Sequence, residues 1–223
     1  MRRSVLAVLA PLVLVLPGCA THQAYLNPQF AATTSAHRTV AILPFHVTIS
    51  RERLPKNLTA EDVARMEREE AFAVQTQLHT QLLRRADQYT VQFQDPSRTN
   101  VMLERAGITY DSLGARTKDE LAKLLGVDAV ISGNVRRRKP MATGTAIALG
   151  VLFGGAFMGN TNEVGVDLQL HNGQDGQLLW NFSHKFGGSI GSSPERLAEA
   201  MMGSIARRLP YRKAEGEGQQ AAR

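Results

Sequence analysis

The motif whose spacing best fits a catalytic site is Gly187-Gly188-Ser189-Ile190-Gly191. The pattern G-x-S-x-G is typical of serine hydrolases, in which a sharp turn between a strand and a helix exposes the nucleophilic hydroxyl. In that fold the acid and the histidine of the triad follow the serine. Here His184 is the last histidine, and only one further helix is expected. We interpret the motif as a glycine-rich turn, and a serine hydrolase using Ser189 stays an alternative.

Residues that could bind a metal ion or a phosphate show no recognised spacing. The six histidines are scattered, and none belongs to an H-E-x-x-H pair. A Walker A lysine motif is absent, and no G-x-G-x-x-G follows the first expected strand. The acidic pairs Glu61-Asp62 and Glu69-Glu70 fall on an expected helix, where a solvated face is the simpler interpretation. The sequence therefore predicts no catalytic residue, no cofactor and no metal, and a protein that is not an enzyme.

Chemistry of another kind is predicted at Cys19, the single cysteine of the chain. Arg2 and Arg3 precede an apolar run from Val5 to Leu16, which is the layout of a signal peptide. The run is too short for a membrane-spanning helix, which needs about 20 apolar residues. The box Leu16-Pro17-Gly18-Cys19 resembles the bacterial lipoprotein signal, whose cysteine is diacylated, cleaved and then N-acylated.

This resemblance implies that residues 1–18 are removed and that Cys19 carries diacylglycerol and a further acyl chain such as palmitate. Several acyl chains would anchor the protein permanently in a membrane. Ala20, and not an aspartate, follows the cysteine, which in Gram-negative lipoproteins implies sorting to the outer membrane. We expect the domain to face the periplasm. The alternatives are an ordinary secretory signal and an uncleaved N-terminal helix.

Composition limits the remaining possibilities. Without the signal, about 200 of the 223 residues remain, a length typical of one domain that can bury its own core. A mature chain whose one cysteine is lipidated has no disulfide. The formal net charge of +6 includes Arg2 and Arg3, so the mature protein is mildly basic. In an exported protein this charge favours lipid headgroups, cell-wall polymer or acidic protein surfaces over nucleic acid.

Hydrophobic periodicity, helix caps and turn residues predict the elements of one domain. We expect a buried strand over 39–43, a helix from Thr59 to about 85, a half-buried strand over 89–93 and a helix over 100–106. We expect a capped helix from Thr117 to Gly126, a strand over 127–135, an antiparallel hairpin of 164–170 with 178–186, and a helix from Ser193 to Pro210. Together they predict an α/β (α+β) fold in which a single mixed sheet with a C-terminal hairpin packs against three to four helices.

The polar segments set the expected boundaries. Residues 19–37 lack periodicity and are predicted to form the lipidated N-terminus and a flexible tether. The domain is expected over 38–210, with a glycine-rich apolar insertion at 141–160. Residues 211–223 are predicted to be a disordered polar tail.

Three segments carry a family resemblance. They are the strand Val40–Phe45, the sequence LGVDAVISGNV at Leu125–Val135, and the hairpin LQLHNGQDGQLLW at Leu168–Trp180. They resemble the lipoprotein superfamily that contains the curli-secretion channel CsgG and the penicillin-binding-protein activator LpoB, and the TolB amino-terminal domain has a related fold. The resemblance covers roughly 38–210. It implies a non-enzymatic envelope protein that acts through a protein partner, which for the LpoB type is a penicillin-binding protein.

The segment 146–158 contains no charged residue and follows Arg136-Arg137-Arg138-Lys139. It is a core element, a surface for a partner or a homo-oligomer, or a membrane contact in which the cations meet phosphates. In CsgG, insertions in this part of the sheet build the barrel of an oligomeric secretion channel, but this segment lacks alternating polar residues. For the cationic cluster alone we favour a solvated strand end. The candidate contact residues are Arg136, Arg137, Arg138, Lys139, Leu149, Leu152, Phe153, Phe157 and Met158.

Overall fold

The computed structural model describes residues 22–50, 58–138, 163–187 and 194–213. Its strands are β1 (His22–Leu26), β2 (Thr39–Ile42), β3 (His46–Ile49), β4 (Gln92–Phe93), β5 (Ala129–Arg138), β6 (Glu163–Asn172) and β7 (Leu178–Gly187). Its helices are α1 (Phe30–Thr34), α2 (Ala60–Leu83), α3 (Pro96–Arg105), α4 (Lys118–Leu125) and α5 (Pro194–Arg208), with short 3-10 turns at Ala86–Gln88 and Leu113–Ala115.

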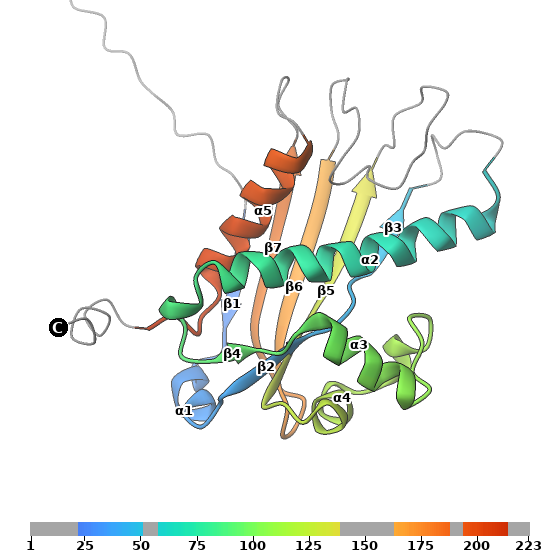
Figure 1. The fold of residues 1–223 in the computed structure, drawn as a ribbon. Coiled ribbons are helices and arrows are strands. Elements are labelled where there is room, and N and C mark those ends of the chain that lie inside the picture. The colour runs from blue at the N-terminus through green and yellow to red at the C-terminus, as the bar shows by residue number, and fades with distance from the viewer. Residues whose placement is uncertain (1–21, 51–57, 139–162, 188–193, 214–223) are drawn as a thin grey trace, which may run out of the picture.

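The strands form one seven-stranded sheet in the order β1-β7-β6-β5-β2-β4, and β3 also pairs with β5 (Figure 1). β2 and β3 run parallel to β5, whereas β6, β7 and β1 are joined by antiparallel pairing. This confirms the predicted mixed sheet and the C-terminal hairpin. Trp180 and Phe182 stack along one face of β7 with ring centroids 5.8 Å apart, as the alternation in that strand predicts.

Helix α2 covers one face of the sheet together with α5 (Figure 1). It begins with the predicted cap, because the Asp62 N–H donates to Thr59 Oγ1 and the Thr59 N–H donates to the Asp62 carboxylate. Its apolar stripe packs into the main core with Val40, Ile42 and Ile131. The buried residues of the stripe are Val63, Ala71, Val74, Leu78 and Leu82.

Helices α3 and α4 pack against the opposite face of the sheet. The alternate strand residues Ala41, Leu43 and Val130 point to that side and form a second, smaller core with residues of both helices. Helix α4 has the predicted capping box at Thr117 and ends at Gly126, whose φ of 64° is the left-handed conformation that favours glycine. The two helix pairs thus cover different faces, and within the described ranges part of the second face carries no helix (Figure 1).

The N-terminal segment differs from the predicted tether. Residues 22–26 form β1, which pairs antiparallel with β7 from His22 opposite His184 to Leu26 opposite Trp180. The strand is followed by Asn27, a buried residue whose N–H donates to the Leu179 carbonyl, and then by α1. The prediction was therefore wrong for 22–34. The physical reason is that an edge strand can be held by backbone hydrogen bonds with little apolar side-chain pattern.

Other element boundaries also differ from the predicted ones. Only Gln92–Phe93 of the expected strand 89–93 pairs as β4, since the Thr90 N–H donates to the Tyr211 carbonyl instead. Helix α3 begins at Pro96, earlier than expected, because Asp95 caps it. The domain also continues past the expected end at 210, as Tyr211 is buried. Strand β3 was not predicted.

Candidate functional site: the polar face and the strand end

Most of the predicted site residues lie outside the described residues. Their roles stay predictions, and they are Cys19, Lys139, Leu149, Leu152, Phe153, Phe157, Met158 and Ser189. The cations Arg136, Arg137 and Arg138 occupy the last three positions of β5. The structure therefore locates one part of the predicted contact surface, the cationic end of this strand.

Arg136, near the end of β5, contacts polar side chains of its neighbours in the sheet. Its guanidinium forms an ion pair with the Asp167 carboxylate of β6 and is 65% exposed. The same carboxylate accepts a hydrogen bond from the Ser183 hydroxyl of β7. An exposed pair of this kind contributes at most about 1 kcal/mol to stability. The pairing fits the interpretation of Arg136 as part of a solvated strand end, since a carboxylate partly neutralises its charge.

A polar face runs across the three central strands on the side away from α2 and α5. Cross-strand register forms three rows, in which Ser132 lies opposite Gln169, Asn134 opposite Asp167, and Arg136 opposite Gly165. On β7 the rows continue through Asn181, Ser183 and Lys185. We call these side chains the polar face. They are half-buried or exposed, while neighbours along the strands such as Ile131, Val135, Leu168 and Phe182 are buried. Amides, hydroxyls and charges of this kind suit a surface that binds a polar partner.

At one end of the sheet, the strands β3, β5, β6 and β7 meet the segments that the structure does not describe (Figure 1). Arg138 at the end of β5 lies opposite Glu163 at the start of β6, which lies opposite Gly187 at the end of β7. Strand β1 begins at this same end, because His22 pairs with His184. We call it the strand end. The predicted insertion therefore connects to the sheet at the end from which the N-terminus also departs.

At the opposite end of the polar face, two cavities share a wall made by Pro44, Tyr110 and Leu113. The first has a volume of about 240 Å³, and Phe72 and Leu103 contribute to its largely apolar lining. The second has about 210 Å³ and a more polar lining that includes the ammonium-bearing Lys118. Sequence reasoning missed both cavities, because their walls come from segments that are far apart in the chain.

Three histidines of the domain are held neutral by burial. Desolvation lowers the pKa of His37 and of His79, and it lowers the pKa of His171 to about 4, with a smaller contribution from the Lys118 charge. Among the described residues, no group of three or more His, Cys, Asp or Glu side chains is arranged to hold a metal ion. Within the same ranges, no helix is both long enough and apolar enough to cross a bilayer.

Comparison with known proteins yields structural likeness only. Neither a protein-family model nor a curated protein sequence matches the chain. A PelC dodecamer structure from Paraburkholderia phytofirmans is 14% identical, with a TM-score of 0.45 over 83% of this chain and 95% of that one. The lipoprotein GNA1162 from Neisseria meningitidis is 12% identical, with a TM-score of 0.43 over 76% and 96%. The LpoB C-terminal domain from Salmonella enterica is 12% identical, with a TM-score of 0.34 over 72% and 94%. Values this low assign no function to this chain.

The arrangement of the described residues is suited to binding. The polar face offers hydrogen-bond donors and acceptors on rigid strands, and the strand end adds Arg136 and Lys185, both exposed. The alternation of polar and apolar residues over 164–170 already predicted one polar side of β6. The register that aligns β5, β6 and β7 into a common face is visible only in the structure.

Proposed function

We propose that this chain is a lipid-anchored protein of the bacterial envelope that acts without catalysis, by binding another envelope protein. The lipoprotein-like signal ending at Cys19 supports the anchor, with residues 1–18 removed. The resemblance to the CsgG and LpoB superfamily supports a protein partner, which in the LpoB case is a penicillin-binding protein. The outer membrane, with the domain in the periplasm, is the location that Ala20 favours.

One observation carries the orientation in this proposal, namely the pairing of β1 with β7. Only Ala20 and Thr21 separate Cys19 from His22, the first residue of β1. Three steps of extended chain reach about 10 Å at most. Acyl chains on Cys19 would therefore hold the strand end close to the membrane.

The same orientation leaves the polar face accessible from the side. Its strands lead away from the strand end, so a partner can approach along their length without meeting the bilayer. The rows of Asn, Ser, Asp and Gln side chains favour a partner surface that is itself polar, since each buried donor or acceptor needs a hydrogen bond. We propose the polar face as the partner-binding surface.

The anchor is tested by expressing the chain with an alkyne-bearing fatty acid and comparing wild type with Cys19→Ala. We expect label and membrane recovery in the wild type and neither in the variant. A wild-type chain of unprocessed mass without label would overturn the anchor.

The partner is tested by placing a photo-crosslinking amino acid at Asn181, on the polar face, in living cells. Thr76 on α2 is the matched control, because it is exposed and α2 covers the opposite face of the sheet (Figure 1). We expect a discrete crosslinked band from position 181, identified by mass spectrometry as an envelope protein. The same bands from both positions, or none from 181, would contradict the proposed surface.

A second candidate function, an oligomeric assembly or secretion component of the CsgG type, is favoured by the exposed edge of the sheet. Among the described strands β1 lies at one edge of the sheet, and its Tyr25 and Leu26 are 46% and 52% exposed. Unpaired edge strands can add a strand from another copy, and head-to-tail contacts of this kind can close into rings. The size of the detergent-solubilised full chain tests this candidate. A ring that Tyr25→Lys disperses supports it, and a monomer excludes it.

A further inference from the structure

The polar cavity lies beside an irregularity in the sheet. β2 and β3 pair in turn with the same edge of β5. Ile42 pairs with Ile131, and His46 pairs with Asn134. From Ile42 to His46 the chain advances four residues, whereas β5 advances only three from Ile131 to Asn134. The extra residue lies within 43–45 and forms a bulge. Bulges commonly re-aim side chains next to binding sites.

The lining of this cavity selects the charge of a ligand. Its polar side chains come from four separate segments, and none of its lining residues is an aspartate or a glutamate. One cation is present together with hydroxyl, amide and imidazole groups, all of which can donate hydrogen bonds to an anion. These polar lining residues are His46, Tyr110, Lys118, Ser132, Asn134 and Gln169.

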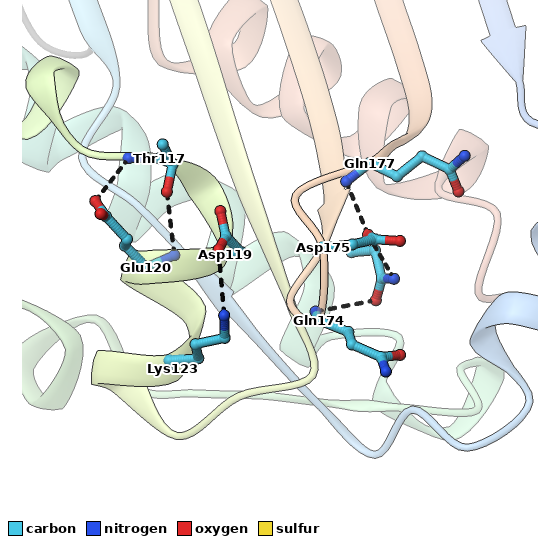
Figure 2. A network of polar contacts seen from close by, with 8 residues as sticks. Thr117, Asp119, Glu120, Lys123, Gln174, Asp175 and Gln177 are labelled. Atoms are coloured by element: carbon cyan, nitrogen blue, oxygen red, sulfur yellow. Dashed lines mark hydrogen bonds and ion pairs between the residues drawn. The ribbon is translucent and has the colours of Figure 1, made fainter.

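Lys118 has no hydrogen bond or ion pair within the described part of the chain. The carboxylates that follow it on α4 are already occupied, as Figure 2 shows. Asp119 pairs with Lys123 at 3.2 Å, and Glu120 accepts from the Thr117 N–H at 3.1 Å. The half-buried ammonium therefore lacks the counter-charge that its neighbours might have supplied.

None of the described residues around Lys118 compensates this charge. Burial lowers the pKa of Lys118, which is the expected effect when an ammonium loses water and gains no anion. The nearby His171 is neutral, and its Nδ1 is buried without a hydrogen-bond partner in the described residues. Leaving a cation and a ring nitrogen unsatisfied costs folding free energy. A bound anion would recover that cost.

The adjacent cavity indicates the rest of the ligand. It lies across the shared wall of Pro44, Tyr110 and Leu113, and its lining is mostly apolar. The Tyr110 hydroxyl accepts a hydrogen bond from the Val47 N–H at 3.1 Å, which holds the wall in place. Each cavity alone is smaller than the roughly 300 to 1,000 Å³ typical of sites for drug-sized ligands, so each suits a small group. Glu104 borders the apolar cavity and would repel a second anionic group there.

We propose that this double cavity binds a small organic carboxylate, with the carboxylate on Lys118 and the amides of Asn134 and Gln169, and with the apolar body against Tyr110 and Leu113. This site shares Ser132, Asn134 and Gln169 with the polar face, but its test needs neither the protein partner nor the lipid anchor. An apolar carboxylate fits better than inorganic phosphate, since phosphate would leave the apolar cavity unused.

The test is calorimetric titration of the detergent-solubilised full chain with 3-phenylpropanoate, its neutral amide and inorganic phosphate, each corrected for binding to empty micelles. We expect saturable binding of 3-phenylpropanoate and at least about tenfold weaker binding of the amide and of phosphate, because only the first probe supplies both groups. Equal binding of acid and amide would overturn the role of charge. Binding of phosphate alone would overturn the organic carboxylate.

Two lysine variants assign the site. Lys118→Met should weaken 3-phenylpropanoate binding at least about tenfold, and Lys123→Met, on the same helix but paired with Asp119, should leave it unchanged. The melting temperature without ligand separates binding from structure. We expect Lys118→Met to keep or raise it, because the change removes an unpaired, partly buried charge. Equal losses in both variants, or no binding by the wild type at 20 mM probe (a concentration on the order of a weak fragment Kd), would overturn the proposal.

Discussion

The Tyr211 hydroxyl lies 2.6 Å from Nδ1 of His37, although 174 residues separate them in the chain. Both residues are buried, at 2% and 7% exposure. His37 lies two residues before β2, and Tyr211 follows the last helix. This single hydrogen bond therefore connects the two ends of the domain.

Tyr211→Phe tests that connection. The variant keeps the ring and its contact with Phe30 but leaves His37 Nδ1 without its partner. We expect the free energy of unfolding to fall by about 1–3 kcal/mol, the usual cost of an unsatisfied buried group. Chemical denaturation of the full chain in detergent measures it. Tyr25→Phe is the control, since Tyr25 is exposed and should tolerate the change. Equal stability of Tyr211→Phe and wild type would contradict the role of the bond.

Three histidines with lowered pKa values predict that stability falls in mild acid. Burial, with a smaller contribution from Lys118, lowers the folded-state pKa of His171 to about 4, while the unfolded value is about 6.5. Above pH 6.5 both states are neutral and the residue has no effect. As the pH falls from 6.5 towards 4, the unfolded chain takes up a proton that the folded chain does not, so stability decreases.

Melting temperatures between pH 7 and pH 4 measure this loss. His37 and His79 act in the same direction, because burial lowers the pKa of each. His171→Gln should flatten part of the pH dependence without abolishing it. A wild type whose melting temperature stays constant over this range would show that these histidines are not held neutral.

Gly133→Ala should destabilise the sheet. A Cβ at Gly133 would lie 2.3 Å from Phe45 Cε1 and 3.0 Å from the Asp167 carbonyl oxygen, so the buried ring or the backbone must move. Overpacking of this kind costs about 1–3 kcal/mol. Gly165→Ala on β6 is the matched control, because the nearest atom lies 3.9 Å away. Denaturant midpoints compare the two variants, and equal midpoints would contradict the tight packing of Phe45 on β5.

Gln75→Leu should break a buried amide pair. Gln75 Nε2 donates to the Ile42 carbonyl at 2.7 Å, and Asn100 Nδ2 donates back to Gln75 Oε1 at 3.0 Å. The variant leaves the carbonyl and the Asn100 amide unsatisfied, at a cost of about 1–3 kcal/mol. The double variant Gln75→Leu, Asn100→Leu should recover part of the loss. Thermal unfolding measures both, and additive losses would argue against the pairing.

Helix caps and the hairpin were the features that sequence predicted best. Thr59, Thr117 and Gly126 act within one turn of chain, so their local geometry determines the helix ends. The hairpin also follows from a local turn and strict alternation. Strand β1 could not be predicted, because its pairing with β7 joins backbones that are about 160 residues apart in the sequence.

The cavity around Lys118 was beyond sequence reasoning for the same physical reason. In the sequence, Lys118 stands between the residues of a capping box and looks like an ordinary exposed helix residue. Its environment comes from the bulge at 43–45 and from Asn134 and Gln169 on two other strands. Contacts between distant segments decide which polar residues become desolvated, and composition or periodicity does not encode those contacts.

The incorporation of residues 22–26 into the sheet limits the reach of this protein. With acyl chains on Cys19, Ala20 and Thr21 would be the only link to β1, which is too short for the domain to move away from the lipid surface. The domain could then reach a partner only within about its own length from the membrane. A protein partner of the kind proposed above would have to be brought to that surface or extend to it. Two variants test this closeness. One carries the anchor at the C-terminal end, and the other carries a long flexible insertion after Thr21. If either supported function as well as the wild type, the closeness would have no role.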